Sequence, residues 1–464
     1  MLVVMSDFHF QDTVSDIVKD GKGNSLIPVD RNVSAEAFRI VFDHLIQIAG
    51  RNHAQELKIV LAGDVFDLHR SQQWFKNNNP VRPYGRYGPA DWGPIAQGIL
   101  NDIIRSNIET FTIFQTFGSQ QTVKLPGHDK EIPFQFEYIP GNHDRIINLY
   151  PPLLDAVCNL LGMQFQNNMP FQNVGLFEKY GAFVCHGHEY DRYNFAGASP
   201  GNQASPTPSS VYNDAPIGDY MTIDIATRMA YEYREQNESK MIDGPDAGMH
   251  RAAYQKLLEF DDVRPQSELI AFMEAEIGWQ AENKLWESIR PVLVKVIQQA
   301  LESEFMADWL NRLNKPGLDW QDLIRFSLER KLWSSMTAIS SEELIRFLIK
   351  LFSGMKWDEA KLWERVSHEP ILKNKAYRYV VAGHTHNPAV EFLCHRQSDR
   401  RDIFFFDTGT WRQQIRKCRD NRTFARAKAL TYVIFYGPNE DPSRTSKTKG
   451  YSFDYWSGFT KKEV

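Results

Sequence analysis

Five short apolar runs in this chain each end in a group of polar side chains, and this repeated pattern limits the possible folds more than any other feature. The groups are Asp7-Phe-His9, Gly63-Asp64, Gly141-Asn-His-Asp144, His186-Gly-His188 and Gly383-His-Thr-His386. Polar residues that follow the strands of an α/β sheet meet at one edge of that sheet. The pattern therefore predicts a sheet that gathers these side chains at a single site.

Strand and helix patterns alternate around these groups. Residues 1–6 and 57–62 are apolar runs typical of strands that are buried on both faces, and residues 34–49 between them place apolar side chains at helical spacing. We expect Gly141 to let its strand turn sharply, because glycine tolerates tight backbone conformations. We also predict a helix near 94–108, a hairpin near 110–137, and strands at 174–178, 182–185, 377–382, 390–394, 403–406 and 429–436.

The region from 217 to 370 differs from the rest, because its apolar positions follow helical spacing. Most of the 11 tryptophans lie there, between Trp279 and Trp363, and we expect them in a core. Residues 195–216 are dense in Gly, Ala, Ser, Pro and Asn, which is typical of a linker or mobile loop. The predicted organisation is a core (1–194 and 371–437) interrupted by that linker and by a helical insertion or cap (217–370), with a C-terminal tail (438–464).

Composition narrows the function classes. The net charge of −5 argues against a protein that coats nucleic acid. The four cysteines are scattered, so neither a zinc ribbon nor a disulfide framework is indicated. The first residues are too short and uncharged for a signal peptide, and no run of about 18 apolar residues occurs. We expect a cytoplasmic protein without a membrane span and with no domain ahead of the core.

The strand-end residues form a donor set that is typical of a metal site. Carboxylates, an amide oxygen and imidazoles suit two neighbouring borderline cations such as manganese, iron or zinc. The set contains no thiolate, so it does not suit a structural zinc site. Its members are Asp7, His9, Asp64, Asn142, His143, His186, His384 and His386.

In the order and content of these motifs, the sequence resembles the calcineurin-like metallophosphoesterases. The resemblance covers residues 1–191 and 377–411, with the blocks Asp-x-His, Gly-Asp-x-x-Asp, Gly-Asn-His-Asp, a further His block and Gly-His-x-His. It implies an α/β (α+β) fold, a four-layer sandwich of two mixed β-sheets flanked by helices, here with a large all-helical insertion. It also implies two divalent metal ions, with Mn²⁺ expected and iron, zinc or nickel as alternatives.

The resemblance also implies roles for the motif residues. Seven would be metal ligands: Asp7, His9 and His386 for the first ion, Asn142, His186 and His384 for the second, and Asp64 bridging both. His143 would lie outside the ligand sphere, close to the leaving-group oxygen, and Asp144 would orient it; both are expected to be catalytic. We expect His188 to face substrate or support a ligand, and Asp67 to orient its neighbours.

The implied reaction is hydrolysis of a phosphoester by a hydroxide that bridges the metals, with His143 protonating the departing oxygen. Protein serine/threonine phosphatases carry an arginine directly after the second aspartate of Gly-Asp-x-x-Asp, where this chain has Leu68. A phosphodiester or pyrophosphate is therefore the expected substrate, such as a nucleotide or nucleic acid, as in the bacterial phosphodiesterase and pyrophosphatase branches.

Two alternatives remain open. The first is a DNA nuclease of the Mre11 type, because the basic run from Arg412 to Lys428, usually a solvated face, offers phosphate contacts. The second is a non-catalytic scaffold that binds a protein partner through the helical insertion. Residues 70–93, rich in Arg, Gly, Pro and aromatics, form either a substrate-contacting wall or a surface loop.

Overall fold

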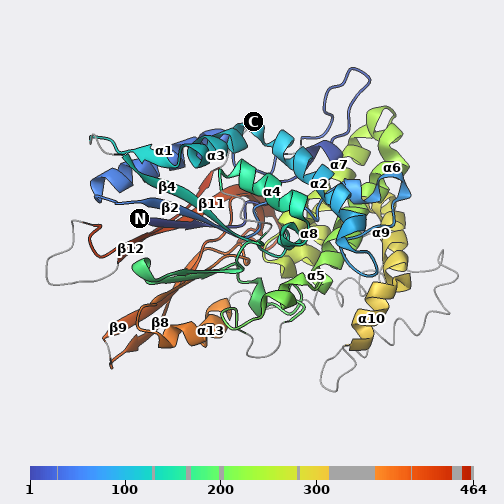
Figure 1. Cartoon of the computed structure of the whole chain (residues 1–464). Helices are drawn as coiled ribbons and strands as arrows, with labels where there is room; N and C mark the ends of the chain where they lie inside the picture. Colours follow the sequence, from blue (N-terminus) through green and yellow to red (C-terminus); the bar gives the residue numbers. More distant parts are fainter. Residues whose placement is uncertain are drawn as a thin grey trace.

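The computed structural model describes residues 1–28, 30–127, 131–163, 169–197, 203–278, 283–312, 361–398, 400–441 and 452–460. In these residues the chain forms two mixed β-sheets accompanied by helices (Figure 1). The mixed α and β class predicted from the sequence is confirmed.

The first sheet has the strand order β10-β11-β1-β2-β4-β3, and β12 also pairs with β11. Its three central strands, β1 (Leu2–Met5), β2 (Leu57–Ala62) and β4 (Glu131–Ile139), are parallel, so their carboxyl ends meet at one edge. The remaining strands pair antiparallel: β3 (Thr122–Lys124), β10 (Gln413–Lys417), β11 (Phe424–Tyr436) and β12 (Ser452–Thr460).

The second sheet has the order β5-β6-β7-β9-β8. Its inner strands, β6 (Ala182–Cys185), β7 (Tyr379–Ala382) and β9 (Arg401–Asp407), are parallel. The outer strands, β5 (Val174–Phe177) and β8 (Ala389–Arg396), close antiparallel hairpins with β6 and β9, which confirms both predicted hairpins. The segments that follow β6 and β7 carry His186, His384 and His386.

Alternation along the strands creates separate cores. Leu2 and Val4 of β1 belong to a core between the two sheets, whereas Val3 and Met5 face the helices on the other side of the first sheet. Those helices are α1 (Ala35–Arg51), α2 (Pro89–Ser106), α3 (Ile108–Gln120) and α4 (Pro151–Leu160) (Figure 1). The short helix α13 (Leu362–Val366) packs on the outer face of the second sheet.

The hairpin predicted near 110–137 is wrong in its first half, because residues 108–120 form α3. Phe111 and Phe114, three positions apart, are both buried and pack with Phe10 and Phe38, as one face of a helix does. Only β3 and β4 form a hairpin there. Strands β10 and β12 were also not predicted, because a basic run and a polar tail lack the apolar alternation of a buried strand.

A helical region lies at one end of the sheets (Figure 1). Its described elements are α5 (Ile217–Tyr220), a π-helical segment (Met221–Thr227), α6 (Arg228–Ile242), α7 (Ala247–Glu259), α8 (Leu269–Glu276), α9 (Lys284–Glu302) and α10 (Glu304–Arg312). Trp286 is buried in its core, as expected. The helices predicted within 313–360 lie outside the described residues. Across the part of the chain that is described, no helix combines the length and apolar character needed to cross a membrane.

The basic run from Arg412 to Lys428 was expected to be a solvated face, and this expectation is wrong in part. Three of its side chains form ion pairs with acidic residues of the helical region: Arg412 with Asp262, Lys417 with Glu268, and Arg426 with Glu259. Three of the seven basic residues of the run therefore belong to an interface within the chain.

Phe38 tests how far the fold depends on the aromatic core beneath the strand ends. Its buried ring lies 4.9 Å from that of Trp411 and 5.8 Å from that of Phe8. We predict that Phe38→Ala lowers the free energy of unfolding by about 3–5 kcal/mol, measured by urea titration, because it leaves a cavity. Ile40→Ala on the same helix, at a side chain that is 60% exposed, should stay within about 0.5 kcal/mol of the wild type. Equal losses in the two variants would contradict this account of the core.

Candidate metal centre

Five predicted site residues adopt a left-handed backbone conformation directly after strands. Their φ angles are 55° for Asp7, 46° for His9, 53° for Asp64, 73° for His384 and 57° for His386. This conformation costs a residue with a side chain roughly 1–2 kcal/mol. Such strain persists only where the surrounding structure enforces it, and it concentrates at functional sites.

Two motif glycines are needed because other groups approach them closely. A Cβ atom on Gly141 would lie only 2.5 Å from the backbone nitrogen of Asp64, and one on Gly383 would lie 2.8 Å from the Cβ atom of Ser6. We expected Gly141 to provide an unusual turn conformation, but its φ lies outside the left-handed region. A glycine is needed at this position because a side chain would overlap Asp64, and not because the backbone adopts an unusual conformation.

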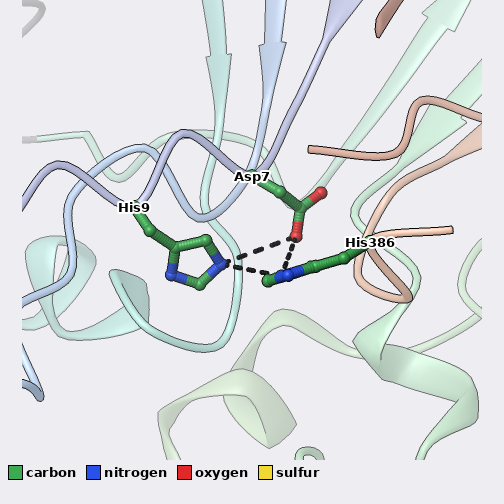
Figure 2. Close-up of side chains that lie close together, drawn as sticks. All are labelled: Asp7, His9 and His386. Carbon is green, nitrogen blue, oxygen red and sulfur yellow. Dashed lines mark hydrogen bonds and ion pairs between the residues drawn. The ribbon is translucent and has the colours of Figure 1, made fainter. Parts of the chain in front are cut away.

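The first group of ligand-type side chains contains Asp7, His9 and His386. Figure 2 shows that they point toward one another, Asp7 and His9 from the segment after β1 and His386 from the segment after β7. The Nε2 atoms of His9 and His386 lie 3.0 Å apart, and Asp7 Oδ1 lies 3.2 Å from the Nε2 atom of His386 and 3.7 Å from that of His9. All three residues are buried.

The second group forms where the segments after β2, β4, β6 and β7 meet. The Nε2 atom of His186 lies 3.2 Å from Asn142 Oδ1 and 3.3 Å from Asp64 Oδ2. His384 joins them, since its ligand atom and those of Asp64 and His186 lie within 4.8 Å of one another. The structure thus brings all seven predicted ligand residues together in two adjacent groups.

Asp64 lies between the groups. The same carboxylate oxygen, Oδ2, is 3.4 Å from the Nε2 atom of His9 and 3.3 Å from that of His186. The other oxygen, Oδ1, accepts a hydrogen bond from the backbone nitrogen of His143 at 2.8 Å. One oxygen is therefore fixed by the backbone, while the other is shared by the two groups.

The chemistry of the donors fits cations in both groups. His186 Nδ1 donates to the carbonyl of Ala62 at 2.9 Å, and His9 Nδ1 donates to Asp67 at 3.1 Å, so each Nε2 atom faces Asp64. Nε2 atoms that face a carboxylate in this way need a positive charge between them, which either a ring proton or a bound cation supplies. Donors about 2.1 Å from one cation are themselves about 3.0–3.4 Å apart, which matches most distances in both groups.

The pKa values of two site residues also indicate that the site stabilises positive charge. Burial lowers the pKa of His186, but Asp64 and Asp7 outweigh it and raise that pKa to about 10. Burial raises the pKa of Asp64, yet His186 and His143 hold it well below its usual range. The carboxylate is therefore ionised, and the site favours a bound cation.

Asp67 orients two imidazoles, as expected. Its carboxylate accepts hydrogen bonds from His143 Nδ1 at 2.8 Å and from His9 Nδ1 at 3.1 Å. Burial would raise the pKa of Asp67, but Arg70 and His143 outweigh it and keep the carboxyl ionised. Both rings are thus held with Nδ1 toward Asp67 and Nε2 on the opposite side.

The predicted orientation of His143 by Asp144 is wrong. The carboxylate of Asp144 accepts hydrogen bonds from the backbone nitrogens of Val65 and Gly141, at 2.8 and 2.6 Å, and from the Tyr138 hydroxyl at 2.6 Å. The Asp144 side chain thus points toward the backbone of Gly141 and Val65. Asp144 therefore joins the backbone after β2 to that after β4, while Asp67 orients His143.

The block after β6 supports its neighbours. Asp191 Oδ2 lies 3.1 Å from His384 Nε2, so it orients that ring. His188 is buried behind His186, and its ring packs edge-on against Phe195 and Tyr212. These two aromatic residues come from the segment 195–216, whose described residues include a short 3₁₀ helix at Ser209–Asn213.

A cavity of about 60 Å³ opens onto both ligand groups. One side is lined by predicted site residues, including Asp64, His143 and His386. The helical region lines the other side with residues that the sequence analysis missed, because no motif marks them: Gly218, Met221, Thr222, Asp261 and Arg264. A second cavity, of about 360 Å³, is lined by residues from 80–87 and from the helical region.

No protein-family model matches the chain, and no curated protein is found as a relative. The residues of the site and their geometry therefore carry the functional conclusion.

Gly141→Ala tests the packing of this centre. The added methyl group overlaps the Asp64 backbone and carboxylate, so we predict a shifted Asp64 and at least a tenfold weaker affinity for Mn²⁺ in calorimetric titration, about 1.4 kcal/mol. Gly248→Ala, at an exposed helical glycine with open space around its Cα atom, should bind Mn²⁺ as the wild type does. Unchanged affinity in Gly141→Ala would show that Asp64 does not need this space.

Proposed function

We propose that this chain is a metal-dependent hydrolase of phosphoester bonds, built as a four-layer sandwich of the calcineurin-like metallophosphoesterase type. The observation that carries the proposal is the position of Asp64 Oδ2, within 3.4 Å of imidazoles from two ligand groups. A carboxylate shared in this way is what a pair of adjacent cations requires.

Seven residues would hold two divalent cations, with Mn²⁺ expected and iron, zinc or nickel as alternatives. When bound, such a pair supplies Lewis acidity that neutralises charge on phosphoryl oxygens and lowers the pKa of water. The first ion would take Asp7, His9 and His386, the second Asn142, His186 and His384, and Asp64 would serve both.

His143 is the proposed general acid. It lines the cavity, and its bond to Asp67 through Nδ1 leaves Nε2 to carry the transferable proton. The buried carboxylate of Asp67 holds the ring in that orientation. A protonated His143 would then give its Nε2 proton to the departing oxygen of the ester.

A phosphodiester or pyrophosphate is the proposed substrate class. The nuclease alternative loses some support, because three of the seven basic side chains in the run that would touch DNA are paired with the helical region. Direct contact of that region with the catalytic cavity favours a small substrate that it helps to enclose.

Hydrolysis of bis-p-nitrophenyl phosphate with added Mn²⁺ tests the proposal. We predict turnover that EDTA abolishes, and a loss of about 10²- to 10⁴-fold in kcat for His143→Ala, because the leaving oxygen loses its acid. Manganese content should stay at the wild-type level in this variant. His395→Ala, at an exposed histidine on β8, serves as the control and should keep full activity.

Asp64→Ala should differ from His143→Ala, because it removes a proposed metal ligand. It should lose both the activity and most of the bound manganese. Wild-type activity in either site variant would refute the assigned roles. A wild-type protein that holds manganese but hydrolyses neither bis-p-nitrophenyl phosphate nor p-nitrophenyl phosphate would support the scaffold alternative.

A further inference from the structure

The helical region reaches the catalytic cavity through the segment from Glu259 to Arg264. Arg264 lines that cavity together with His143 and is only 8% exposed. Its Nε atom donates to His386 Nδ1 at 3.1 Å. A guanidinium group is thus placed beside a proposed metal ligand, although it lies outside every motif of the core.

This guanidinium is held by its own segment. Nη1 donates to the carbonyl oxygens of Asp261 and Val263, at 2.8 and 2.9 Å, and the Arg264 backbone nitrogen donates to Ile415 of β10 at 2.9 Å. Fixing a long side chain in advance reduces the entropy that it loses when it binds a ligand. The segment therefore presents Arg264 in a prepared position.

The acidic neighbours of Arg264 anchor the segment to the core. Asp261 pairs with Arg70, and Asp262 pairs with Arg412 and accepts a hydrogen bond from Gln413 Nε2 at 3.0 Å. These pairs are buried or nearly so, hence costly to break. The anchoring keeps Arg264 at the cavity.

The bond to His386 also constrains what Arg264 does in a working site. An imidazole that accepts at Nδ1 carries its hydrogen on Nε2, whereas an imidazole that ligates a metal through Nε2 carries its hydrogen on Nδ1. The Arg264 bond and metal ligation by His386 Nε2 therefore exclude each other. With His386 as a ligand, the Nε–H group of Arg264 no longer donates to Nδ1 of that ring, while Arg264 still lines the cavity.

We propose that Arg264 binds a non-bridging oxygen of the substrate phosphoryl group, so that the helical region completes the phosphate-binding site. This inference rests on the proposed phosphoester hydrolase function. A guanidinium matches phosphate oxygens in both charge and geometry. The helical region then determines affinity for the phosphoryl group directly, as part of the site.

Calorimetric titration of inorganic phosphate into the Mn²⁺-loaded full chain tests this proposal. Arg264→Met should raise the Kd for phosphate by about 10- to 100-fold, the value of a charge-assisted hydrogen bond, with manganese content unchanged. The Kd of Arg264→Lys for phosphate should fall between those of Arg264→Met and the wild type, since lysine keeps the charge but lacks the paired N–H donors of a guanidinium. Arg251→Met, on α7 of the same region, should bind phosphate as the wild type does.

Wild-type phosphate affinity in Arg264→Met would overturn the proposal. A parallel loss of manganese would also overturn it, because Arg264 would then act on His386 rather than on substrate. Turnover of bis-p-nitrophenyl phosphate by the wild type is measured separately. An inactive wild type whose phosphate affinity still depends on Arg264 would refute the hydrolase function alone; an active wild type with no such dependence would refute this inference alone.

Discussion

The buried carboxylate of Asp67 ties the site to the rest of the molecule. One oxygen accepts a hydrogen bond from His143 and the other from His9, so a single residue sets the direction of two rings. Two arginines lie beside it, and both reach carboxylates of the helical region. The contacts are Arg70 with Asp67 and Asp261, and Arg412 with Asp67 and Asp262. Separating the helical region from the core would leave these buried charges without their partners, which costs free energy. The ion pairs therefore hold the two regions together.

Backbone geometry supplies the second constraint. Parallel strands from two sheets end at the same edge, and left-handed residues directly after them turn the chain so that carboxylates and imidazoles converge. Each such residue stores strain, and each buried carboxylate loses hydration. In the proposed dinuclear centre, bound cations would offset both costs.

The sequence predicted the parts that depend on local order. Strands followed by ligand-type residues identified eight site residues, since a strand end fixes where its next residues lie, and the family resemblance implied which seven of them belong to the two ligand groups. Contacts made across the chain were not predictable in this way. Asp144 follows His143 yet bonds to backbone elsewhere, and Arg264 reaches the cavity from a region without a motif. Helix α3 was missed because its phenylalanines also suit a strand.

The central claim is that Asp64 is shared by two cations, and anomalous diffraction from crystals grown with Mn²⁺ tests it most directly. We predict two anomalous peaks per chain, about 3.5–4 Å apart, on either side of Asp64 Oδ2. One peak should be bound by Asp7, His9 and His386, and the other by Asn142, His186 and His384. A single peak, or peaks away from Asp64, would contradict the dinuclear centre and the phosphoester chemistry proposed from it.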